Sequence, residues 1–165
     1  MVRTHHSRRS SAGFSLVEVL VASAIISASL LGIITLANKS LLISRQSLST
    51  YQASNLLEEG AEAVRTLRDG GWSNISGLSA GTTYYPVFST STNTWSLATS
   101  SSSVGAFTRS VTVGSVSRDN STQDIVSSGG TNDTGTKLVT VAVTWTDTGT
   151  TFTKTLKLYL SDILS

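Results

Sequence analysis

The segment Gly13-Phe14-Ser15-Leu16-Val17-Glu18-Val19-Leu20 decides how the rest of the chain is organised. It opens an apolar run from Phe14 to Ala37 whose one formal charge is the carboxylate of Glu18. An acid in such a run is costly without a partner, so Glu18 is a candidate functional residue. At about 1.5 Å per residue, a helix over residues 14–37 would measure about 36 Å, enough to cross a hydrocarbon core of about 30 Å. We therefore predict a transmembrane segment here.

A short basic segment, residues 1–13, precedes the apolar run. It carries Arg3, Arg8 and Arg9, so the positive-inside rule predicts that the N-terminus stays in the cytoplasm. Without these 13 residues, Lys and Arg together fall from 12 to 9 against 10 Asp and Glu, and the net charge becomes −1. The excess positive charge therefore belongs to the leader, and we do not expect nucleic-acid binding.

The helix is predicted to continue beyond the apolar run, to about Arg68. Seven small or apolar residues fall on one stripe of a 3.6-residue repeat. They are Ala53, Leu56, Leu57, Gly60, Ala61, Val64 and Leu67. Gly70 and Gly71 then provide a stop signal. We expect a helix over residues 14–69, of which only the second half packs on a globular domain.

After Gly71 the pattern becomes that of β-strands. Five segments rich in Val, Thr and aromatic residues are predicted as strands: 82–88, 94–97, 107–116, 137–146 and 151–160. Residues 89–93, 100–105 and 118–136 are predicted as loops, and 147–150 as a hairpin turn. We expect a register change near residues 153–155, and Pro86 on an edge strand or at a bend.

These elements predict the α+β fold class. Residues 70–165 would form a β-rich head in which a four- or five-stranded antiparallel sheet packs against the amphipathic half of the helix.

The N-terminal residues resemble the type IV pilin superfamily, which includes pilins, minor pilins and type II secretion pseudopilins. The match consists of Arg8-Arg9, then Gly13, then Phe14-Ser15-Leu16-Val17-Glu18. The resemblance implies that a membrane prepilin peptidase cuts between Gly13 and Phe14 and N-methylates Phe14. It also implies that Glu18 acts in assembly, by meeting the new ammonium group of Phe14 on an adjacent subunit.

The chain departs from the major pilins of this family in two ways. Thr35 stands where they often carry a helix-breaking proline, and the absence of cysteine excludes their C-terminal disulfide loop. The closing segment, residues 137–165, looks like minor pilins of the PilV type. The resemblance therefore implies a minor pilin or a pseudopilin.

The expected partners are other pilin subunits, the prepilin peptidase, the inner-membrane assembly platform and the membrane itself. The expected location is the inner membrane for a single-pass precursor, and then an extracellular or periplasmic filament.

Other interpretations stay open. An ordinary signal peptide could be cut near Ala22-Ser23-Ala24, although its apolar region would normally be shorter and lack an acid. The chain could also be a single-pass anchored β-domain that acts as a binding module. For Glu18, the plain alternative is a solvated carboxylate at the cytoplasmic interface of the membrane-stored monomer.

An enzyme is the weakest interpretation, because the sequence offers no catalytic constellation. Cysteine is absent, both histidines lie in the leader, and the later aspartates are scattered among turns or strand ends. Asp119-Asn120-Ser121 with Asp124 lacks the spacing of an EF-hand, which leaves calcium as an open question. We expect no cofactor and no metal.

Overall fold

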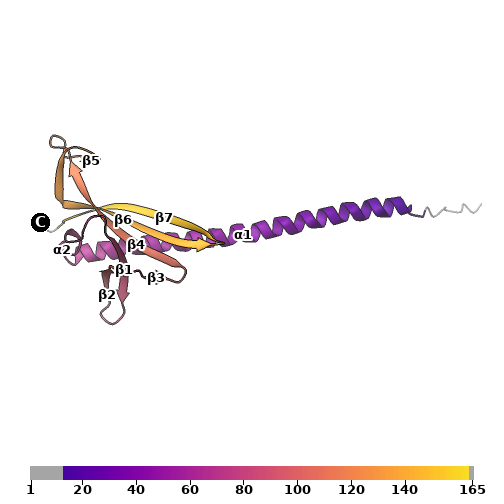
Figure 1. Ribbon diagram of the computed structural model, residues 1–165, viewed down its shortest axis with the longest axis horizontal. Coiled ribbons are helices and arrows are strands. Elements are labelled where there is room, and N and C mark those ends of the chain that lie inside the picture. Colours follow the sequence, from indigo (N-terminus) through magenta and orange to yellow (C-terminus); the bar gives the residue numbers. More distant parts are fainter. Residues whose placement is uncertain (1–12, 164–165) are drawn as a thin grey trace, which may run out of the picture. The chain divides into compact units, whose positions relative to one another are not determined.

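The computed structural model describes residues 13–163, and the predicted leader therefore lies outside the described residues except for Gly13. The chain divides into two units, Met1–Arg45 and Gln46–Ser165. Helix α1, Leu16–Asp69, contributes to both units (Figure 1). The prediction of one helix ending near Arg68 is confirmed.

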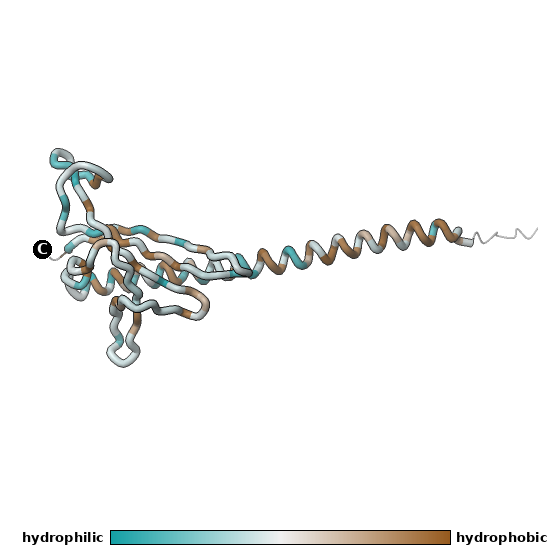
Figure 2. The backbone as a smooth tube through the Cα atoms, in the orientation of Figure 1, coloured by the Kyte–Doolittle hydropathy of each residue, from teal (hydrophilic) through white to brown (hydrophobic). Residues whose placement is uncertain are grey.

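In the first unit α1 is the one element of the described residues. The backbone N–H groups of Glu18 and Val19 both donate to the carbonyl of Ser15, at 2.9 and 3.2 Å, and so begin the helix. Figure 2 shows that apolar residues dominate this part of α1. The helix has no break at Thr35, the position where a proline would interrupt it.

The second unit contains the end of α1, the short helix α2 and an antiparallel sheet. Helix α2 is Ser73–Ser76. The strands are β1 Thr83–Ser89, β2 Thr94–Ala98, β3 Ser103–Val104, β4 Phe107–Arg118, β5 Ile125–Val126, β6 Thr131–Asp147 and β7 Thr150–Ser161. The order is β2-β1-β4-β6-β7, and β3 and β5 each pair with β4. The α+β fold class is confirmed, but the sheet has seven strands rather than four or five.

The loop prediction for residues 118–136 is wrong over much of its length. β5 lies within it, and β6 begins at Thr131, whose partner in β4 is Arg118. The register between β4 and β6 shifts between Ser115 and Val116, where a β-bulge skips residues of β6. The Ser, Thr and Asn residues of this segment are mostly exposed to solvent, but the backbone of β5 and of the start of β6 is still paired with β4. For the same reason β3 was missed within residues 100–105.

The predicted register change in the last strand is also wrong. Pairing between β6 and β7 is unbroken from Asp147 opposite Thr150 to Thr136 opposite Ser161. The apparent break in the apolar pattern is Lys154, whose Nζ donates to Ser54 Oγ of α1 at 2.9 Å. A lysine can therefore occupy a helix-facing position because α1 supplies an acceptor.

Pro86 lies in β1, which is an inner strand rather than an edge strand, but at a position beyond the pairing of β1 with β4. β1 pairs with β4 only through Thr83 and Tyr84, whereas its pairing with β2 extends from Tyr85 to Ser89. The missing N–H of Pro86 therefore removes no hydrogen bond to β4.

The core lies between the second half of α1 and the sheet. Six residues of α1 are buried: Ala53, Leu57, Gly60, Ala61, Ala63 and Val64. They meet a row of valines in β4 and β6, including the fully buried Val111, Val139, Val141 and Val143. The predicted stripe is confirmed, with Leu56 and Leu67 partly buried at its margin.

Arg109 is a buried cation that the sequence pattern did not single out. Its side chain is 4% exposed, and Nη1 lies 3.0 Å from Glu59 Oε1 of α1. Its guanidinium carbon lies 5.1 Å from the centroid of the Trp95 ring, within cation–π range. Arg109 therefore links α1, β2 and β4. Its position in β4 indicates its burial, because Arg109 lies two residues from both Phe107 and Val111 and therefore on the same, buried face of the strand.

Candidate functional site

The candidate site is the N-terminal end of the first unit, around Gly13, Phe14 and Glu18. Gly13 and Phe14 precede the first helical residue, Leu16, so the peptide bond between them is not part of the helix. A Cβ added at Gly13 would meet no atom within 4 Å, and Phe14 is 81% exposed. A peptidase could reach this bond without unwinding α1.

Glu18 lies in the first turn of α1, where the positive end of the helix dipole favours a carboxylate. It is exposed and takes part in none of the ion pairs found among residues 13–163. A hollow of about 430 Å³ lies beside it, lined by Phe14, Glu18, Val19, Ala22, Ser23 and Ile26. Apart from Glu18 and the Ser23 hydroxyl these side chains are apolar, so the carboxylate lies at the edge of a hydrocarbon surface.

Large apolar side chains of α1 stay uncovered throughout the first unit. From Phe14 to Ile43 their exposed fractions range between 53 and 81%. Among the described residues, α1 is the one helix long and apolar enough to cross a membrane. The exposure continues past the predicted end of the span at Ala37, through Leu41 and Leu42.

Within residues 16–37, the hydroxyl groups of α1 all have acceptors in their own helix. Ser23 donates to the carbonyl of Leu20, and three further hydroxyls donate to the carbonyl four residues earlier, at 2.8–2.9 Å. These are the hydroxyls of Ser27, Ser29 and Thr35. No hydroxyl of residues 16–37 needs water or a partner subunit, which leaves Glu18 as the unsatisfied polar side chain of that stretch.

The possible calcium loop of the head is a self-contained turn. Asp119 accepts hydrogen bonds from the backbone N–H groups of Ser121 and Thr122, which hold the pKa of its carboxyl below the ordinary value. No group of three potential metal-ligating His, Cys, Asp or Glu side chains occurs in the described part of the chain.

Comparison with known families identifies the N-terminal segment. Residues 8–34 match the prokaryotic N-terminal methylation motif, and the matched stretch includes Gly13, Phe14 and Glu18. No significant match was found among curated proteins or solved structures. The motif and the apolar helix together support membrane anchoring, and the motif points to a structural subunit rather than to an enzyme. The chain thus carries, at residues 8–34, the N-terminal motif that supports a place among type IV pilin-like or pseudopilin subunits.

Proposed function

We propose that this chain is a structural subunit of a type IV pilus-like filament, and specifically a minor pilin. Residues 1–13 are a leader, residues 14–69 form the assembly helix and residues 70–165 form the displayed head. The precursor is held in the inner membrane with its N-terminus in the cytoplasm. The prepilin peptidase cuts between Gly13 and Phe14 and methylates the new N-terminus, and the assembly platform then adds the subunit to a periplasmic or extracellular filament.

The observation that carries this proposal is the combination of the methylation motif with an apolar helix surface that has no cover. The motif occupies the segment where every large apolar side chain is more than half exposed. In the membrane, lipid tails cover this surface. In a filament, helices of neighbouring subunits replace the lipid, and small residues such as Ala22 and Ser23 allow them to approach closely.

Glu18 supplies what apolar packing lacks, which is a fixed register. Exchanging lipid for protein gains little hydrophobic free energy, so association depends on fit and on polar partners. An unpaired carboxylate inside a helix bundle is costly, whereas one paired with the ammonium of a neighbour's Phe14 is satisfied in one alignment only. Cleavage after Gly13 creates that ammonium, so processing would switch assembly on.

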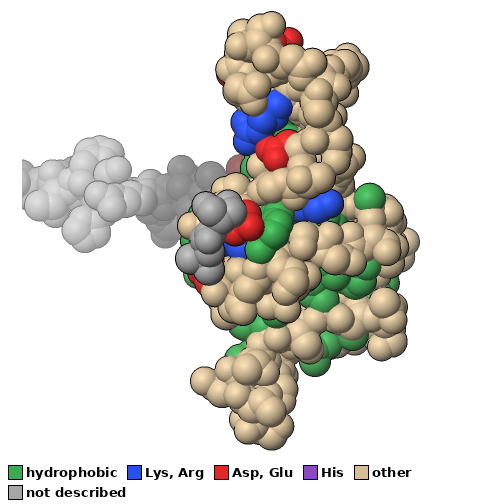
Figure 3. All heavy atoms as spheres, turned by 90° about the vertical axis from the view of Figure 1, so that its left-hand side faces the viewer, with side chains coloured by type: hydrophobic (Ala, Val, Ile, Leu, Met, Phe, Trp, Pro, Cys, Tyr) green, Lys and Arg blue, Asp and Glu red, His purple; other side chains and the backbone are tan. Residues whose placement is uncertain are grey.

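The head gives indirect support for a minor rather than a major subunit. It has no cysteine for a disulfide loop. Figure 3 shows one face of the molecule, on which polar uncharged groups and backbone dominate. The second candidate is a type II secretion pseudopilin, which is favoured by the same motif.

Mass spectrometry of the mature N-terminus tests the processing step. We expect a first residue of Phe14 carrying one added methyl group. A mature start at Ile25 would show an ordinary signal peptide, and an intact Met1 would show no processing; either result overturns the proposal.

Filament incorporation tests the role of Glu18. Glu18→Leu should be absent from sheared filaments while it remains in the membrane fraction. Glu58→Leu makes the same chemical change at an exposed position elsewhere on α1, and it should be incorporated normally. Equal incorporation of both variants would refute the pairing of Glu18.

If the chain is instead an anchored binding module, it would be absent from filaments altogether. Cysteines introduced into residues 14–37 of neighbouring copies would then fail to cross-link.

A further inference from the structure

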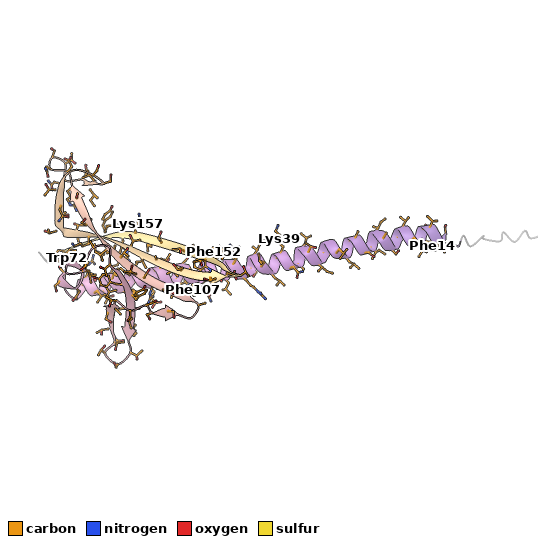
Figure 4. All side chains as sticks on the ribbon, viewed as in Figure 1. Phe14, Lys39, Trp72, Phe107, Phe152 and Lys157 are labelled. Carbon is orange, nitrogen blue, oxygen red and sulfur yellow. The ribbon has the colours of Figure 1, made fainter. Side chains whose placement is uncertain are left out.

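Two opposite charges bracket the uncharged part of α1 in the first unit. Between Glu18 and Lys39 lie about 20 residues without a formal charge, which at about 1.5 Å per residue span about 30 Å. This equals the thickness of a typical hydrocarbon core. Figure 4 labels Phe14 and Lys39, which lie on either side of this stretch.

Nothing between Val19 and Ala37 requires water. The four hydroxyls of this stretch donate to carbonyls of the same helix. Polar groups that do require water appear at both of its ends: Glu18 at one, and Asn38, Lys39 and Ser40 at the other. The boundary between satisfied and unsatisfied polar groups therefore coincides with the two charges.

The span of residues 14–37 predicted from hydropathy has a similar length, but it places the charge of Glu18 inside the membrane. It would sink the carboxylate of Glu18 about 6 Å into the hydrocarbon, with no counter-ion among the described residues. A span that starts five residues later, at Val19, and ends one residue later, at Asn38, brings Glu18 to the headgroups. The long stem of Lys39 can extend its ammonium to the opposite surface. The two spans differ little in length, so the position of the charged groups is what distinguishes them.

The residues beyond Lys39 suit the outer interface. Leu41, Leu42 and Ile43 are 53–60% exposed and are followed by Arg45. Apolar side chains beside cations are typical of segments that lie at the level of the headgroups, where Lys39 and Arg45 can meet lipid phosphates.

We propose that the precursor is held in the bilayer by residues 19–38, with Glu18 and Lys39 at the two headgroup layers and residues 41–45 seated on the outer one. This inference rests on the proposed membrane-anchored precursor and specifies its lipid contacts. The Gly13–Phe14 bond then lies at the cytoplasmic surface. Glu18 leaves water only when the subunit enters a filament.

Cysteine accessibility tests this register, and the chain itself contains no cysteine. Val17→Cys, Ala28→Cys and Ser40→Cys would be made in the full precursor, in cells without prepilin peptidase, and exposed to a membrane-impermeant maleimide from each side. Because a thiol in hydrocarbon stays protonated and unreactive, we expect Val17→Cys and Ser40→Cys to react at least about tenfold faster than Ala28→Cys. The reactive sides should be cytoplasmic and outer, respectively.

Charge variants show whether Glu18 and Lys39 set the boundaries. Adding Glu18→Gln should protect Val17→Cys, and adding Lys39→Leu should protect Ser40→Cys, whereas the conservative Lys39→Arg should leave Ser40→Cys reactive. Protection of Val17→Cys in the unaltered background would overturn the register, even with the chain in the membrane. Absence of the chain from the membrane fraction would instead refute the proposed function.

Discussion

Gly60→Ala is the change that most directly tests how α1 packs on the sheet. Gly60 is buried in the middle of the helix stripe, where α1 and the sheet approach closely. A Cβ at this position would lie 2.7 Å from Val141 Cγ1 and 3.0 Å from Arg109 Cδ. Both distances are well below an optimal carbon–carbon separation of about 3.5–4.0 Å.

Two effects of this substitution oppose each other. Alanine is favoured over glycine in a helix by about 1 kcal/mol, while forcing an extra methyl group into a packed core typically costs about 1–3 kcal/mol. Neither neighbour can move aside easily, because Val141 is fully buried and β-branched and Arg109 is confined by Glu59 and Trp95. We therefore expect an overpacking cost near the upper end of this range, so that the free energy of unfolding falls by about 2 kcal/mol.

Thermal unfolding of the full chain in detergent, followed by tryptophan fluorescence, would measure this effect. A loss of about 2 kcal/mol should lower Tm by roughly 5 °C or more. Gly114→Ala is the matched control, because its Cβ would meet no atom closer than 3.7 Å. In a Val141→Ala background, which opens space beside Gly60, the same Gly60→Ala change should become neutral or stabilising. An unchanged or higher Tm for the single Gly60→Ala variant would refute the close approach.

Four further changes probe polar groups of the second unit by unfolding measurements. Arg109→Met should leave the free energy of unfolding nearly unchanged. Glu59→Leu leaves the buried guanidinium of Arg109 without its carboxylate partner, and it should lower the free energy of unfolding by about 1–2 kcal/mol. Hydrogen bonds, chiefly from Arg118, hold the pKa of Asp133 below its ordinary 3.8, so their contribution is present above about pH 4 and is lost as the pH falls through the lower, folded-state pKa. In the Asp133→Asn variant, the free energy of unfolding should therefore change less with pH in the acidic range. Lys154→Met should cost less than about 1 kcal/mol, because a single partly exposed hydrogen bond is lost.

The parts of the fold that the sequence predicts are those in which apolar residues follow a simple period. The helix stripe that includes Leu57 and Val64 has a repeat of 3.6, and the strand that includes Val139 and Val141 has a repeat of 2. In each pattern the apolar residues lie on one face of the element, so the sequence alone predicts which face is buried. The processing motif around Gly13 is equally local, because it depends on neighbouring residues alone.

The features that the sequence does not reveal depend on partners distant in the chain. Nothing near Lys154 indicates that Ser54, a hundred residues away, accepts its hydrogen bond. The polar start of β6 at Thr131 is a strand only because β4 offers its edge. Arg109 resembles an exposed strand residue until Glu59 and the β1–β2 hairpin cover it.

The two parts of α1 differ in whether their apolar residues are buried by the rest of the same chain. In the second unit the apolar residues form a stripe, and one sheet face covers it. In the first unit Leu16, Val17, Ile25 and Ile26 are spaced around the whole circumference of the helix, and each is at least 59% exposed. A helix that is apolar all round requires an apolar environment on every side. A single partner helix would leave most of that surface in water, so either the bilayer or several neighbouring helices must enclose this segment.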